Sequence, residues 1–236
     1  MAAQRGGADG VSLVNTFKSV IGVDRDTFSP IPSVGGEGSS GGYCGPAVKP
    51  IALHMVTRLG KAPEFRLPVS GIGGVQSWED ALDFLLLGAS SVQVCTAAMH
   101  YGFRIVQEMT LGLEEWMREK GYARIEEFRG RALPNYRDWG NLDLNFKIVA
   151  EIDPATCIGC QLCYAACEDG AHQCIALQAG TRVPLVKQDE CVGCNLCQIV
   201  CPVDGCITMI EVDQGLPRES WNDRVARGTA GAGGRH

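Results

Sequence analysis

Eight cysteines of this chain stand in two runs with the same spacing. The first run is CIGCQLCYAAC over residues 157–167, and CVGCNLCQIVC repeats it over residues 191–201. Three thiolates on a tight loop can each bind a different iron of a cubane cluster, and the fourth thiolate, on the following short helix, binds the other cluster. The spacing therefore predicts two [4Fe-4S] clusters with interlocked ligand sets: Cys157, Cys160, Cys163 and Cys201 for one, and Cys191, Cys194, Cys197 and Cys167 for the other.

A zinc module is the alternative interpretation of these cysteines. Zinc sites generally use pairs of cysteines rather than two runs of four, so the cluster interpretation is favoured. Cys174 and Cys206 follow the two runs at matching places, and we interpret them as small apolar packing residues rather than ligands. Glu168 stands where a proline often follows the fourth cysteine, which affects the turn and not the ligands.

Two glycine-rich turns form a second candidate site. The sequence GIGG over residues 71–74 follows an expected strand, and GGYCG over residues 41–45 precedes an expected helix. Such turns expose backbone N–H groups and let a phosphate approach closely. One turn of this kind is more often a close-packed turn. Two of them, followed by a strand end at Cys95 and Thr96, favour a flavin or nucleotide phosphate.

Asn15 and Thr16 follow the first expected strand. A carboxamide offers a donor and an acceptor side by side, which complements the N–H and C=O edge of a pyrimidine. Taken alone, such a pair is more often a turn or a helix cap. Cys44 and Cys95 are candidate reactive thiols, but buried packing is the commoner role and the one we expect.

The elements that position these residues follow from changes in hydrophobic period. Short apolar runs predict strands over residues 11–14, 67–70 and 91–95, and helical periods predict helices over 50–59, 77–88 and 103–120. A capping box is expected at the start of the second helix. Alternating strands and helices indicate a parallel sheet of the α/β class. The long segment 22–45 is rich in glycine, serine and proline, and is expected to be functional or disordered.

Composition bounds the class of protein. The chain has 236 residues, 12 cysteines and a formal net charge of −6, which argues against binding nucleic acid. Neither a signal peptide nor an apolar run long enough to span a membrane is visible, so we expect a cytoplasmic protein whose thiols are metal ligands or buried. The expected domains are an α/β region over 1–120, a connector over 121–150, a two-cluster domain over 151–213 and a disordered tail over 214–236.

The order of these motifs resembles one family. The segments VSLVNT, GGYCGPAVKPIAL and VSGIGGVQSWEDALDFLLLGASSVQVCTA, followed by the double cluster motif, are similar to the catalytic, FMN-containing subunit of bacterial NAD-dependent dihydropyrimidine dehydrogenase. The cluster motif alone is shared with many ferredoxins, and the preceding motifs with dihydroorotate dehydrogenases. The resemblance implies the C-terminal part of a (β/α)8 TIM barrel of the dihydroorotate dehydrogenase type, fused to an α+β ferredoxin-like domain with two [4Fe-4S] clusters.

The resemblance also implies roles for individual residues. Electrons would pass from NAD(P)H through an FAD-bearing partner subunit and the clusters to FMN, interconverting uracil or thymine and the 5,6-dihydropyrimidine. The pyrimidine would be held by Asn15 and Thr16. The residues that match FMN contacts are Gly45, Ile72, Gly73, Gly74, Cys95 and Thr96.

One departure from the family concerns length. A complete barrel needs about 250 residues, whereas only the last three barrel strands have counterparts here. The proton-donating cysteine of the family falls in the absent first five strands, so we assign no catalytic residue. The chain is then either a fragment of a longer reading frame or one half of a split enzyme, and in the second case a missing N-terminal barrel half is expected as a partner. The alternative is a stand-alone two-cluster electron carrier with a vestigial barrel. A dihydroorotate dehydrogenase is a third option, against which the fused cluster domain argues.

Overall fold

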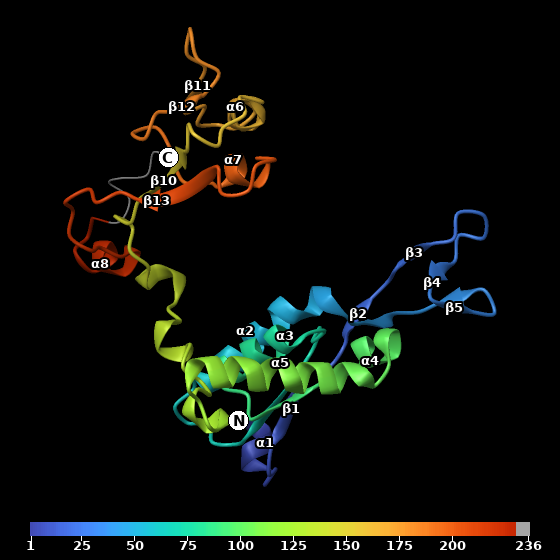
Figure 1. The fold of residues 1–236 in the computed structure, drawn as a ribbon. Helices are drawn as coiled ribbons and strands as arrows, with labels where there is room; N and C mark the ends of the chain where they lie inside the picture. The colour runs from blue at the N-terminus through green and yellow to red at the C-terminus, as the bar shows by residue number, and fades with distance from the viewer. Residues whose placement is uncertain (230–236) are drawn as a thin grey trace. The chain divides into compact units, whose positions relative to one another are not determined.

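The computed structural model describes residues 1–229, which form two compact units divided between Tyr136 and Arg137 (Figure 1). Residues 230–236, part of the tail for which we expected disorder, lie outside the described residues. None of the helices within residues 1–229 combines the length and the apolar character needed to cross a bilayer.

The first unit is built on a three-stranded parallel sheet with β8 in the centre, which confirms the expected α/β class. Its strands are β1 (Val11–Leu13), β8 (Val69–Ile72) and β9 (Ser91–Gln93). The helices that follow these strands along the chain are α2 (Lys49–Gly60), α3 (Trp78–Leu86), α4 (Thr96–Tyr101) and α5 (Arg104–Lys120) (Figure 1). The central strand begins two residues later than expected, because Pro68 has no N–H to donate to the ladder.

The two faces of this sheet differ in chemistry. One face presents Val11, Val69 and Val92 to the core, where Phe84 of α3 is fully buried. The opposite face carries a row of serines in register, with Ser12 opposite Ser70 and Ser70 opposite Ser91. The amide of Gln93 donates to Ser12 Oγ at 2.9 Å and to Ser70 Oγ at 2.8 Å. The sheet therefore has one apolar face under helices and one polar face.

Local signals set the helix ends in the first unit. The capping box expected at α3 is confirmed, because Ser77 Oγ accepts from the backbone N–H of Asp80 and the Asp80 carboxylate accepts from that of Ser77. Helix α5 ends at Gly121, whose left-handed φ of 75° closes the last turn. Sequence periodicity missed α4, since six residues are too few to display a helical period.

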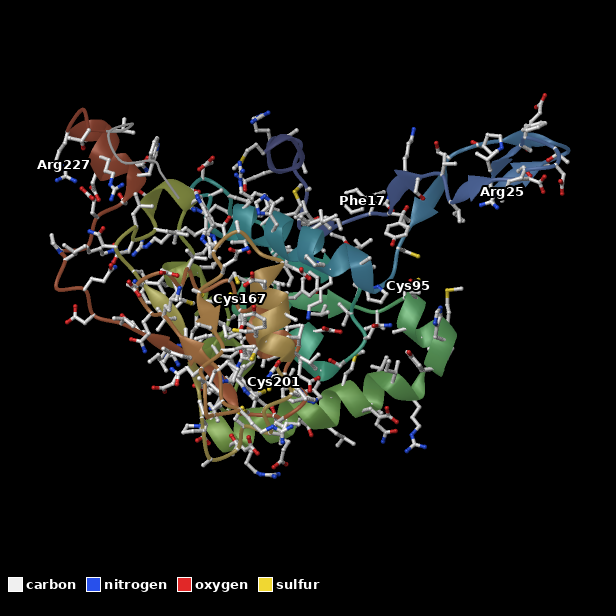
Figure 2. The ribbon with its side chains drawn as sticks, turned by 90° about the horizontal axis from the view of Figure 1, so that it is seen from above. Phe17, Arg25, Cys95, Cys167, Cys201 and Arg227 are labelled. Carbon is white, nitrogen blue, oxygen red and sulfur yellow. The ribbon has the colours of Figure 1, made fainter. Side chains whose placement is uncertain are left out.

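The glycine-rich segment expected to be a loop forms an arm of short antiparallel pairs. Strand β2 (Phe17–Ser19) pairs with β7 (Gly41–Tyr43), β3 (Gly22–Val23) with β4 (Pro30–Ile31), and β5 (Ser33–Val34) with β6 (Glu37–Gly38). Asp24 stabilises a turn of the arm by accepting from the backbone N–H groups of Asp26 and Thr27. Figure 2 shows the arm running outward from Phe17 toward Arg25.

Residues 121–136, expected to begin a connector, pack on the first unit instead. Phe128 is fully buried and stacks edge-on against Trp116 of α5 with ring centroids 5.1 Å apart. The backbone N–H of Gly130 donates to the carbonyl of Leu85 at 2.9 Å. The remaining short elements of the unit are α1 (Ala2–Arg5) and the 3-10 turns Pro46–Val48, Ile125–Glu127 and Leu133–Asn135.

The second unit repeats one pattern of strand, cysteine loop, helix and strand. Strand β10 (Ile148–Ile152), α6 (Leu162–Glu168) and β11 (Ile175–Ala176) form the first half; β12 (Leu185–Val186), α7 (Leu196–Ile199) and β13 (Ile207–Glu211) form the second. Antiparallel pairs join β10 to β13 and β11 to β12, so each strand of one half pairs with the other half. A ferredoxin-like fold is therefore confirmed. The 3-10 turn Trp139–Asn141 also lies in this unit.

Part of the tail expected to be disordered forms helix α8 (Trp221–Ala226). Ser220 and Asp223 make a second capping box, with Ser220 Oγ accepting from the backbone N–H of Asp223. The amide of Asn145 donates to the carbonyl of Pro217 at 2.7 Å. These bonds fix residues whose composition alone indicated disorder.

Candidate functional site: two cysteine pockets and a glycine-lined pocket

Two pockets of the second unit each collect cysteines from both runs. Pocket I is lined by Cys157, Cys160, Cys163, Cys201 and Cys206. Pocket II is lined by Cys167, Cys174, Cys191, Cys194 and Cys197. The fourth cysteine of each run thus lies with the first three of the other run, which is the grouping that the spacing predicted.

Left-handed backbone turns shape both cysteine loops. Gly159 and Gly193 have φ of 67° and 70°, and two residues later Gln161 and Asn195 have φ of 63° and 65°. The repeated turns lead the chain into α6 and α7, whose first turns carry buried Cys163 and Cys197. A Cβ at Gly193 would lie 2.7 Å from the carbonyl oxygen of Ile148, so this loop approaches β10 closely.

The donor chemistry of the two pockets fits iron–sulfur clusters. All 12 cysteines of the chain are free thiols. Burial raises the pKa of Cys163 and raises that of Cys197 to about 11, because a low-dielectric site disfavours a thiolate. Coordination to iron supplies the missing positive charge and makes the thiolate the stable form.

A buried amide in pocket II also fits a bound cluster. Asn195 Oδ1 is buried without a hydrogen-bond partner within the described residues, and Asn195 lines the pocket. Turning this amide by 180° puts its N–H2 group at the present position of Oδ1, and an N–H2 group can donate to cluster sulfur. A cluster sulfur in the pocket would give this amide the partner that it lacks.

No three His, Cys, Asp or Glu side chains within residues 1–229 converge on a point that one metal ion could occupy. This result applies to a single metal ion and not to a cluster of several irons. Four thiolates of a cubane each bind a different iron, so they surround a larger group than an ion.

The glycine turns of the first unit line one pocket of about 280 Å³. It lies at the carboxyl ends of the three parallel strands, which is the end of an α/β sheet where ligands bind. All eight residues that the resemblance assigns to FMN and pyrimidine line it: Asn15, Thr16, Gly45, Ile72, Gly73, Gly74, Cys95 and Thr96.

Backbone packing makes one wall of this pocket. Gly45, Gly73 and Gly74 have φ of 91°, 133° and 72°. A Cβ at Gly74 would lie 2.8 Å from the carbonyl oxygen of Gly45 and 2.9 Å from the backbone nitrogen of Lys49. The two glycine turns therefore touch through their backbones at the start of α2, a close approach that fits a phosphate cradle.

Lys49 secures the same wall. Its ammonium pairs with Asp80 and with Asp83 of α3, the latter at 2.7 Å. Burial lowers the pKa of Lys49. The two carboxylates raise it by more than burial lowers it, so the pKa of Lys49 lies above its ordinary value. The charge of Lys49 thus ties α2 to α3 beneath the turns.

Asn15 and Thr16 enter the pocket from the end of β1. Asn15 Oδ1 accepts from the backbone N–H of Thr16 at 2.8 Å, which is the turn-forming contact that the alternative interpretation expected. The contact uses the amide oxygen and leaves the N–H2 group to donate to a ligand. The local turn and a ligand contact are therefore compatible in one side chain.

The expectation that Cys44 and Cys95 pack in the core is wrong, because both side chains are exposed. Both line the pocket, and Thr96 Oγ1 donates to Cys44 Sγ at 3.4 Å. Sequence analysis also missed Gln93 and Met99 as lining residues. The signal for Gln93 was its alternation with Ser91 along β9, which puts both on the polar face of the sheet.

Fold and sites together define an oxidoreductase class: an α/β domain with a glycine-lined pocket, joined to a two-cluster domain. The family model for dihydroorotate dehydrogenase matches residues 1–117, and the model for a 4Fe-4S dicluster domain matches residues 150–209.

Curated relatives match this chain over different lengths. The chain is 44% identical over 213 residues to the NAD-dependent dihydropyrimidine dehydrogenase subunit PreA of Escherichia coli K12, an alignment that covers 90% of this chain and 52% of the relative. It is 46% identical over 133 residues to the catalytic subunit of dihydroorotate dehydrogenase B (NAD(+)) of Pyrococcus horikoshii, covering 56% of this chain and 42% of that protein. The chloroplastic dihydropyrimidine dehydrogenase (NADP(+)) of Arabidopsis thaliana is 40% identical over 133 residues. That alignment covers 55% of this chain and 31% of the relative.

These similarities confirm the resemblance predicted from the sequence. The chain is a relative of a dihydropyrimidine dehydrogenase subunit along 90% of its length, and it spans about half of that relative. The dihydroorotate dehydrogenase match ends before the cluster domain, whereas the match to PreA extends through most of the chain.

Proposed function

We propose that this chain is the C-terminal part of the catalytic subunit of a cytoplasmic dihydropyrimidine dehydrogenase, which interconverts uracil or thymine and the 5,6-dihydropyrimidine. One observation carries the proposal: the eight residues assigned to FMN and pyrimidine line a single pocket in a chain that also has a dicluster domain. Electrons would come from NAD(P)H through an FAD-bearing partner subunit.

The residues of the pocket divide between flavin and substrate. The backbone of Gly45, Gly73 and Gly74 receives the phosphate of FMN, with Ile72, Cys95 and Thr96 lining the same pocket. Asn15 and Thr16 hold the pyrimidine edge. Bound FMN supplies hydride transfer to and from the pyrimidine ring, and these residues orient the two rings for it.

The cysteines of the second unit hold the two clusters. Cys157, Cys160, Cys163 and Cys201 bind one in pocket I, and Cys191, Cys194, Cys197 and Cys167 bind the other in pocket II. Bound clusters carry single electrons between the partner's flavin and FMN.

The sheet of the first unit supports a complementary barrel segment as a partner. Within residues 1–229, β1 and β9 each pair with β8 alone, and Ser12 and Gln93 on the polar face of the sheet are exposed. Parallel sheets are normally covered on both faces, and a barrel leaves no open edge. A segment supplying the other barrel strands would pair with these edges and enclose the polar row.

Reconstitution tests the function. The chain is co-expressed with a segment encoding the first five barrel strands of a relative and with the FAD-bearing partner, and uracil-dependent NADH oxidation is measured anaerobically. Turnover that requires all three parts supports the proposal. Bound FMN without turnover on uracil or thymine, or turnover on orotate instead, contradicts it.

A control variant and the metal content separate the main alternative. Asn15→Leu removes the carboxamide and should abolish pyrimidine turnover while bound FMN stays at the wild-type level. Full iron loading with no FMN under any of these conditions would instead favour a two-cluster electron carrier with a vestigial barrel.

A further inference from the structure

One side-chain amide of the second unit has a buried atom without a hydrogen-bond partner. Among the buried side-chain nitrogen and oxygen atoms of residues 1–229, Asn195 Oδ1 is the one that has none. An unpaired buried polar atom costs free energy and is rare in folded proteins. Asn195 lines pocket II, where Cys191, Cys194 and Cys197 also lie. The unpaired atom therefore belongs to a side chain of this cysteine pocket.

The usual role of an asparagine at this position does not explain the amide. Asn195 is the N-cap of α7, where an asparagine oxygen normally accepts from a backbone N–H of the first helical turn. Here the residue has a left-handed φ of 65°, and its side chain makes no capping hydrogen bond. Its backbone carbonyl takes part in the helix by accepting from the N–H of Ile199 at 3.2 Å. The side-chain amide is therefore left for a group bound in pocket II.

Gln161 occupies the equivalent position of the first cysteine run. It is the N-cap of α6, has a φ of 63° and makes no capping hydrogen bond with its side chain. It also lines pocket I. Gln161 is exposed, so water can satisfy its amide, whereas Asn195 is half-buried and its Oδ1 is fully buried. The two pockets therefore share the cysteine spacing and the turn but differ in this amide.

The charge of a bound cluster decides which end of the Asn195 amide faces it. The sulfurs of a [4Fe-4S] cluster and of its thiolate ligands carry negative charge and accept hydrogen bonds, so they repel an amide oxygen and attract an N–H2 group. Rotation about the last side-chain bond of asparagine has a broad, roughly two-fold energy profile, so the two ends exchange at little cost. An N–H donor at sulfur stabilises the reduced form, which carries one more electron, and raises the reduction potential.

We propose that the side-chain N–H2 group of Asn195 donates to a sulfur of the cluster in pocket II and raises the reduction potential of that cluster, whereas Gln161 has a smaller effect in pocket I. The inference rests on the ligand assignment of the proposed function. It makes the two clusters inequivalent although their ligand spacing is identical, and it favours an electron in pocket II relative to a chain without this amide.

Anaerobic redox titration followed by electron paramagnetic resonance tests the inference in the full chain loaded with iron and sulfide. The variants are Asn195→Leu, Asn195→Gly and the matched control Gln161→Leu. Leucine meets a left-handed backbone at both positions, with φ of 65° and 63°, so the two leucine variants carry the same strain. Glycine removes the amide without that strain. Cys194→Ser and Cys160→Ser, which change one exposed cysteine of pocket II and pocket I, identify which signal belongs to which pocket.

Asn195→Leu should shift the reduction equilibrium of the pocket II cluster about tenfold toward the oxidised form, which is about 59 mV for one electron. Asn195→Gly should shift it in the same direction, because it also lacks the donor, and Gln161→Leu should change the pocket I potential by much less. An unchanged pocket II potential in Asn195→Leu, or an equal shift of pocket I in Gln161→Leu, overturns the inference alone. A shift in Asn195→Leu that is absent from Asn195→Gly would come from backbone strain and also overturns it.

Iron content separates this failure from that of the proposed function. Wild-type chain that holds fewer than about eight irons overturns the ligand assignment and the inference together. If Asn195→Leu alone loses iron, the potential of Asn195→Gly decides. Fewer irons in Asn195→Gly than in wild type would show that the amide is needed to hold the cluster, which overturns its role in setting the potential.

Discussion

The turn at Gly74 is the most demanding backbone position of the proposed flavin pocket, and Gly74→Ala tests it. Two costs add in this variant. An L-residue at φ of 72° is strained by about 1–2 kcal/mol. The new Cβ also meets Gly45 oxygen at 2.8 Å and Lys49 nitrogen at 2.9 Å. Both contacts are to backbone, so no side-chain rotation relieves them and the two turns must separate.

Gly121→Ala is the matched control. Its φ is 75°, close to that of Gly74, but a Cβ there meets nothing within 4 Å. Both variants should lose about 1–2 kcal/mol of stability from the backbone strain, which lowers Tm by about 2–8 °C in a chain of this size. Only Gly74→Ala should also lose FMN affinity, by at least about tenfold or about 1.4 kcal/mol.

Flavin fluorescence quenching measures the affinity, with the complementary barrel segment present, and thermal unfolding measures the strain. Equal FMN affinity in the two variants would refute the argument that the touching turns form the phosphate cradle. A normal affinity in Gly74→Ala with a lowered Tm would show that the turns are a packing feature only.

Three further outcomes are expected. Gly193→Ala places a Cβ 2.7 Å from the carbonyl oxygen of Ile148 and should lower the iron content from about eight to about four per chain. The control Gly205→Ala has a similar φ of 71° but open space around the new Cβ, so an iron assay should still find about eight irons. Ser220→Ala removes the cap of α8 and should cost about 1 kcal/mol, seen as faster amide exchange confined to that helix. Lys49→Met should lower Tm at pH 8 by breaking the pair with Asp80. Because the pKa of Lys49 is raised by folding, the pair stabilises the fold fully below the unfolded pKa of about 10.4, and the difference between variant and wild type should vanish as pH rises through the folded pKa. An undiminished difference there would contradict the assignment of the stability to this pair.

The cysteine spacing determined the chemistry of the second unit before any fold was known. Three closely spaced cysteines are typical of an iron–sulfur cluster site. Two such runs predict that the fourth cysteine of each run binds the cluster of the other run. The capping box at Ser77 and the left-handed stop at Gly121 were equally legible, because such signals act within one turn of a helix. The tail was not, since the bonds from Asn145 to Pro217 and from Asn222 to Asn141 join residues far apart in the chain.

The sequence by itself determined residue types and local turns: eight cysteines in two runs of the same spacing, two glycine turns and a strand–helix alternation. Only the tertiary structure decided which distant residues meet. It packs the turn at Gly74 against the one at Gly45, exposes Cys44 in their pocket, and brings Cys201 to the pocket of Cys157, Cys160 and Cys163. The reason is physical: spacing along the chain fixes contacts within a turn, whereas the direction of a side chain across the fold depends on packing from every neighbouring element.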